Sequence, residues 1–70
     1  MTIQRGVTSI GPFAFASCDK LTEVILPSSL KTLERYAFYW CDNLRSASVP
    51  ESLKDVADYA FEYDVSIQYI

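Results

Sequence analysis

Short stretches of alternating apolar and polar residues recur along the chain, and two of them end at a proline. Val24 and Leu26 stand two residues apart just before Pro27, and residues 47–50 repeat this arrangement. A period of two with β-branched residues is typical of a strand that is buried on one side. Proline ends such a strand because it has no N–H to donate. We therefore predict strands at 21–26 and 44–49, each followed by a turn.

These stretches belong to a repeat of 23 residues that runs along nearly the whole chain. The same step relates five columns: Ile10, Leu33 and Val56; Ala14, Ala37 and Ala60; Phe15, Phe38 and Phe61; Leu21, Leu44 and Ile67; Val24, Ala47 and Ile70. A unit with one short strand cannot bury its apolar side alone, so neighbouring units have to stack and bury like side chains in columns. We predict a single repeat domain over 1–70, with units at 7–29 and 30–52 and partial units at 1–6 and 53–70.

Each unit is expected to contain two further segments besides its strand. Residues 30–33 and 53–56 are short and are expected to be extended, on the opposite side of the unit. Residues 13–18, 36–41 and 59–63 are too short for independent helices, so we expect single helical turns at a corner, held by packing. Strand residues between the buried ones then form the outer face of a parallel sheet.

The unit resembles the BspA-type leucine-rich repeat. The matching positions in the first unit are Val7, Ile10, Gly11, Ala14, Phe15, Cys18, Leu21, Val24, Leu26 and Pro27. The resemblance implies an α/β fold, namely a right-handed leucine-rich-repeat solenoid with a parallel sheet on one face and short helical turns at the corners. Departures are Asp64, where the other units have cysteine, and Ala47, where a larger side chain is usual. About three units are present, where family members commonly carry many more.

The same resemblance implies a class of function. Known relatives are mostly bacterial or protozoan proteins that are secreted or held at the cell surface, with proposed roles in adhesion and protein–protein contact. A non-catalytic interaction or adhesion module is therefore expected, as a fragment or as a short array. No signal peptide is recognisable in this chain, because it lacks a basic segment followed by an apolar one.

Composition narrows the partners and the chemistry. The 70 residues include six Lys and Arg against nine Asp and Glu, a net charge of −3, and no histidine. Nucleic-acid binding is not expected, because it depends on clustered cations that release counterions. Without histidine the commonest general base and metal ligand are missing, and no nucleotide-binding or hydrolase motif is present. We therefore expect no enzyme activity, cofactor or metal, and the short apolar runs argue against membrane insertion.

Two cysteines occupy equivalent corners of neighbouring units. Stacking places the Cα atoms of Cys18 and Cys41 about 5 Å apart, which lies within the range for a disulfide. Side chains in a stacked column point the same way, however, and cysteine readily acts as a small apolar residue. Buried free thiols are the favoured interpretation, with a disulfide as the alternative.

Two surfaces are candidates for binding. The outer strand residues form a mixed sheet face that consists of Glu23, Ile25, Arg45, Ser46, Ser48, Gln68 and Tyr69. Repeat proteins often bind through this face, although it is equally consistent with an ordinary solvated surface. The corner aromatics Tyr39, Trp40 and Tyr63 offer a ledge for a sugar ring, as in a carbohydrate-binding module, or for a partner side chain. They are also consistent with a cover over the Phe column.

The outermost units suggest self-association. Repeat arrays need caps with a polar outer face, and none is recognisable. We therefore expect exposed apolar groups and an unpaired strand edge, involving Ile3, Phe61, Ile67 and Ile70. Another copy of the chain, giving a homo-oligomer, or further repeats would cover these residues, and a frayed monomer is the alternative.

Overall fold

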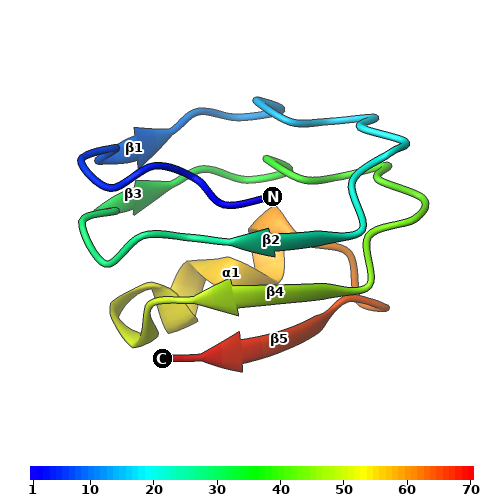
Figure 1. The fold of residues 1–70 in the computed structure, drawn as a ribbon. Helices are drawn as coiled ribbons and strands as arrows, with labels where there is room; N and C mark the ends of the chain where they lie inside the picture. The colour runs from blue at the N-terminus through cyan, green and yellow to red at the C-terminus, as the bar shows by residue number, and fades with distance from the viewer.

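Two small parallel sheets and one helix surround the core (Figure 1). The computed structural model describes residues 1–70. Strands β2 (Glu23–Ile25), β4 (Ser46–Val49) and β5 (Ser66–Tyr69) form a parallel sheet in the order β2-β4-β5. Strand β1 (Ser9–Ile10) pairs in parallel with β3 (Thr32–Leu33), and α1 (Lys54–Ala60) lies against β3. In Figure 1, β1, β3 and α1 follow one another from top to bottom, as do β2, β4 and β5.

The register of the strands confirms the 23-residue step for the first two units. Val24 pairs with Ala47, and in the smaller sheet Ile10 pairs with Leu33. At the next pair the step shortens to 20 residues, because Ala47 lies opposite Ile67. The column that was predicted to run through Val24, Ala47 and Ile70 therefore runs through Ile67 instead. Ile70 follows the strand and is largely exposed.

The cause of this shift lies in the corner that precedes β5. Phe38 stands nine residues before the central strand position Ala47, whereas Phe61 stands only six residues before Ile67. Three residues of the corner are thus missing in the third unit. Phe61, which precedes the shortened segment, therefore keeps the 23-residue step from Phe38. Strand β5, which follows that segment, does not keep it.

The phenylalanine column is the centre of the core, as predicted. The ring centroids of Phe15 and Phe38 are 5.1 Å apart and those of Phe38 and Phe61 are 4.8 Å apart, with interplanar angles of 5° and 6°. Phe38 is 1% exposed. Ala37 and Ala60 beside the column are fully buried, and their small side chains let neighbouring units approach closely.

Strand alternation follows the prediction. Val24 and Leu26 are buried, whereas Ile25 between them is 38% exposed. Backbone hydrogen bonds continue the pairing beyond the strand, since the Leu26 N–H donates to the Ser48 carbonyl at 2.9 Å. The larger strands therefore have one face on the core and one in solvent.

The segment predicted to be extended at 53–56 is helical instead. A short 3₁₀ helix at Glu51–Leu53 leads directly into α1. Leu53, Ala57 and Ala60 are buried at spacings of four and three residues, which places them on one face of the helix. The equivalent segment of the second unit instead contains strand β3.

The corners at residues 12–17 and 35–40 are tight turns and not the helical turns that were predicted. Phe13, Ser17, Tyr36 and Trp40 all have φ near +60°. This left-handed conformation costs a non-glycine residue about 1–2 kcal/mol. Hydrogen bonds between units offset the cost, for example from the Phe38 N–H to the Ala60 carbonyl at 2.9 Å.

Candidate functional site

The outer sheet face gathers most of the residues expected there. Cross-strand pairing aligns Glu23 with Ser46, and Ile25 with Ser48 and then Gln68. Arg45 precedes β4 and is exposed. Four of these six side chains are exposed and the two serines are half-buried. The face is therefore small and mainly polar, with Ile25 as its one large apolar group.

Tyr69 is not part of the outer sheet face, and its placement there was wrong. It pairs with the buried Val49 and packs against the core. The 20-residue step explains the error, because a shift by an odd number of residues moves a strand position to the opposite face. Burial raises the pKa of the Tyr69 hydroxyl, and the nearby Asp58 carboxylate adds to the effect.

Four aromatic side chains cluster at the corner of the first two units, and we name this cluster the aromatic corner. It consists of Phe13, Tyr36, Tyr39 and Trp40. The Phe13 ring lies 5.4 Å from the Tyr36 ring and 5.9 Å from the Trp40 ring, centroid to centroid. Tyr39 meets both Tyr36 and Trp40 edge-on, at 4.6 and 6.2 Å. Phe13 is 47% exposed and Trp40 is 55% exposed, so this surface is apolar and open to solvent.

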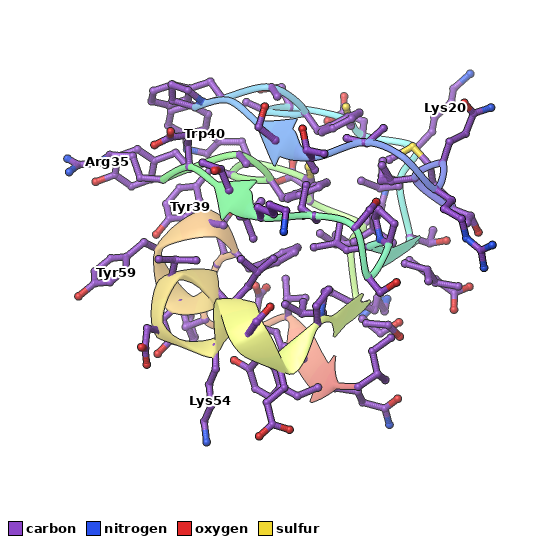
Figure 2. All side chains as sticks on the ribbon, turned by 90° about the vertical axis from the view of Figure 1, so that its left-hand side faces the viewer. Lys20, Arg35, Tyr39, Trp40, Lys54 and Tyr59 are labelled. Atoms are coloured by element: carbon purple, nitrogen blue, oxygen red, sulfur yellow. The ribbon has the colours of Figure 1, made fainter.

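Figure 2 shows the surroundings of the aromatic corner. Tyr39, Trp40, Tyr59 and Arg35 point out on the same side of the molecule, whereas Lys20 lies on the opposite side. Tyr59 is strongly exposed and lines a shallow hollow together with Tyr36 and Arg35. The corner thus combines tryptophan, tyrosine and arginine in one exposed region.

The predicted ledge of Tyr39, Trp40 and Tyr63 is only partly assembled. Tyr63 is fully exposed and has no ring within stacking distance, whereas Tyr39 and Trp40 do meet. Sequence reasoning missed Phe13 and Tyr36. Their signal was present, because Phe13, Tyr36 and Tyr59 are also 23 residues apart.

Backbone contacts hold the aromatic corner in place across three units. The Trp40 N–H donates to Oε1 of Glu62, which belongs to the third unit, at 2.5 Å. The Ser17 N–H of the first unit donates to the Tyr39 carbonyl at 2.9 Å. Trp40, Tyr36 and Phe13 also have left-handed backbones. Such conformations persist where the surrounding structure fixes them, and they concentrate at functional sites.

Both cysteines are free thiols. Cys41 is buried and its thiol donates to the Phe15 carbonyl at 3.2 Å, whereas Cys18 is half-buried. Burial raises the pKa of the Cys41 thiol, so the thiol stays protonated at neutral pH. Cys41 therefore acts as a core residue that links the second unit to the first.

The outermost units are less exposed than expected. Phe61 was predicted to be presented to solvent, but it is 1% exposed and belongs to the core. Ile3 is half-buried, and its N–H donates to the Ile25 carbonyl at 3.0 Å. Ile67 is half-buried. Of these four residues only Ile70 is largely exposed, at the edge of the sheet that β5 forms.

Other kinds of site would need a cluster of metal ligands or a long apolar helix. No group of three or more Cys, Asp or Glu side chains lies close enough to hold a metal ion. None of the helices combines the length and apolar character needed to cross a bilayer. The aromatic corner and the outer sheet face are the two surfaces that gather sequence-predicted binding residues.

Comparison with known proteins gave one match. The model of a family described as the BspA type leucine rich repeat region, in six copies, matches residues 1–70. The match covers both sheets, helix α1 and the aromatic corner. No curated protein and no solved structure matches the chain.

Proposed function

The chain belongs to the BspA-type leucine-rich-repeat family, and we propose that it is a protein-interaction or adhesion module whose main contact surface is the aromatic corner. Members of this family are generally non-enzymatic interaction modules and are typically secreted or held at the cell surface. A surface or secreted location is part of the proposal for this chain. The observation that carries it is the half-exposed cluster of Phe13, Tyr36, Tyr39 and Trp40.

The composition of the corner supports a protein partner. Residues that dominate binding energy in protein interfaces are enriched in Trp, Tyr and Arg and lie in well-packed clusters. Trp40, Tyr36 and the neighbouring Arg35 match these types. The Tyr36 and Trp40 N–H groups donate hydrogen bonds to the third unit, so binding would order few groups and lose little conformational entropy. The outer sheet face has only Ile25 as a large apolar anchor, and we assign it a flanking role.

The fold part of the proposal concerns how the units continue. Consecutive units pair their strands in parallel, and connections between parallel strands are right-handed in nearly all proteins. We propose a right-handed leucine-rich-repeat solenoid, with residues 1–70 as a single repeat domain.

A carbohydrate-binding module is the second candidate, and Tyr39 and Trp40 would carry it. A sugar stacks on an open ring face. Phe13 lies nearly parallel to Trp40, at 18°, so each covers one face of the other, and the second face of Trp40 is the one left for a sugar. This arrangement therefore favours a protein partner over a carbohydrate. A protein partner can also contact the ring edges and the tyrosine hydroxyl groups of the corner.

Substitution of Trp40 tests the proposed contact surface. The parent chain is first screened against a panel of immobilised extracellular-matrix and serum proteins. For any protein that it binds, we expect Trp40→Ala to weaken the affinity at least tenfold. A tenfold loss corresponds to about 1.4 kcal/mol of binding free energy. The variant keeps the backbone N–H that bonds Glu62, and its circular dichroism melting curve controls for folding. Surface plasmon resonance measures the affinities.

Two controls separate the alternatives. Ile25→Ala removes the apolar anchor of the sheet face and should leave binding within twofold. If Ile25→Ala abolishes binding while Trp40→Ala does not, the contact surface is the sheet face. If a glycan array gives Trp40-dependent binding and the protein panel gives none, the carbohydrate alternative replaces the proposal.

Self-association is a separate proposal with narrower support than the sequence indicated. Because Phe61 is buried, the contact between two copies would involve the free edge of β5 together with Ile67 and Ile70. Size-exclusion chromatography with light scattering should then give a homodimer at micromolar concentration that Ile70→Lys converts to a monomer. A parent chain that is monomeric under these conditions excludes self-association.

A further inference from the structure

A hollow lies beside the aromatic corner, where the third unit is three residues shorter than the units before it. Tyr39 borders it from the second unit, and Asp58, Glu62 and Tyr63 border it from the third. Apolar surface from Phe61, Val65 and Ile67 completes its lining. Glu62 stands where the second unit has Tyr39, one residue after the stacked phenylalanine.

The lining combines aromatic rings with negative charge. Asp58 and Glu62 contribute two carboxylates, Tyr39 and Tyr63 contribute two phenol rings, and no lysine or arginine lines the hollow. Lys54 is the one cation among residues 51–70, and it extends away from Tyr39 in Figure 2. The same segment contains five acidic residues: Glu51, Asp55, Asp58, Glu62 and Asp64. The charge around the hollow therefore favours a cation.

The two carboxylates are held differently. Glu62 accepts the Trp40 N–H through Oε1, which fixes its carboxylate at the junction between the hollow and the aromatic corner. Asp58 lies on α1, is exposed and also lines the hollow. An organic cation placed between them would meet the negative charge of two third-unit carboxylates together with the rings of Tyr39 and Tyr63, and aromatic rings attract cations.

We propose that this hollow binds a lysine or arginine side chain of the partner protein. The inference rests on the proposed function, because it specifies partner chemistry at the border of the same contact surface. The alkyl stem of the side chain would lie on Val65, Ile67 and the Tyr63 ring while its charged end reaches the carboxylates. A metal ion fits less well, because no third acidic or sulfur ligand is close to these two.

A pair of matched peptides tests the proposal without the partner. The probes are acetyl-Gly-Gly-Lys-Gly-Gly-amide and the same peptide with norleucine, which keeps the alkyl chain and lacks the ammonium group. In ¹⁵N-resolved NMR titrations of the 70-residue chain we expect the lysine peptide to shift the amide signals of Glu62, Tyr63 and Val65 in a saturable way. The norleucine peptide should bind at least fivefold more weakly, and added salt should weaken only the lysine peptide.

Two variants assign the effect to the hollow. The double variant Asp58→Asn with Glu62→Gln removes both charges, and the glutamine keeps an oxygen that accepts the Trp40 N–H. This double variant should bind the lysine peptide at least fivefold more weakly than the parent chain does. Asp55→Asn removes the same kind of charge from the same helix but does not line the hollow, and it should leave binding within twofold.

Three results would overturn the proposal. They are equal binding of the two peptides, an equal loss in Asp55→Asn and in the double variant, and binding of choline without binding of the lysine peptide. The proposed function fails separately, because Trp40→Ala tests the aromatic corner with a whole partner and leaves both carboxylates in place. The peptide titration tests the hollow alone.

Discussion

Phe38→Ala is expected to destabilise the chain by about 3–5 kcal/mol, because it removes the middle ring of the stacked column and leaves a cavity between Phe15 and Phe61. A 70-residue domain has a total stability of about the same size. Most of the variant should therefore be unfolded at 25 °C. Far-ultraviolet circular dichroism during thermal and urea unfolding measures the effect.

Two companion variants keep this prediction interpretable if Phe38→Ala fails to fold. Phe38→Leu keeps most of the apolar volume and should cost about 1–1.5 kcal/mol, which lowers the melting temperature by about 4–12 °C. Phe13→Ala removes an equally large ring that is half exposed, and it should cost much less than Phe38→Ala. Similar losses in Phe13→Ala and Phe38→Ala would show that the column is not the centre of the core.

The second large effect is expected for Leu26→Ala, at about 2–5 kcal/mol. Leu26 is buried on the core side of the main sheet, and its neighbour Ile25 faces outward. Ile25→Ala removes a side chain of similar size and should cost less than about 1 kcal/mol, because the Ile25 side chain buries much less apolar area than that of Leu26. Urea unfolding of the two variants measures the difference.

The comparison of these two variants is the direct check on the alternation of the strand. A larger loss in Ile25→Ala than in Leu26→Ala would mean that the strand presents the opposite face to the core. That result would also remove the outer sheet face as a candidate surface, since its residues share the face of Ile25.

Periodic features of this fold could be predicted from the sequence alone. Stacked units place like residues on like residues, so the 23-residue step led directly to the phenylalanine column and to the pairing of Val24 with Ala47. The family match over residues 1–70 agrees with the same pattern. Such predictions succeed because burial in a repeat depends on position within the unit.

The third unit departs from the period, and there the predictions failed. A sequence alignment with a constant step misplaced Ile70 and Tyr69 by three strand positions, because three corner residues are missing before β5. The helix at Lys54–Ala60 was missed because residues 53–56 were assigned to an extended segment and Ala60 to the corner. The pattern of apolar residues in so short a segment does not distinguish a helix from a strand, so the assignment depends on how the neighbouring units pack.

The aromatic corner was found only in part for a different reason. The sequence shows which aromatic residues are equivalent, but it does not show that Phe13, Tyr36 and Trp40 adopt left-handed backbones. That conformation is rare for large side chains and is stabilised here by hydrogen bonds between units. Which rings meet therefore depends on the assembled stack and not on the spacing along one unit.

The stacking of consecutive units, with one shortened step, is the central claim, and a ¹³C-edited NOESY spectrum of the uniformly labelled chain tests it most directly. We expect cross-peaks between the rings of Phe15 and Phe38 and of Phe38 and Phe61, and from the Ala47 methyl group to Ile67. Cross-peaks from the Ala47 methyl group to Ile70 in place of Ile67, or the absence of contacts between the phenylalanine rings, would contradict it.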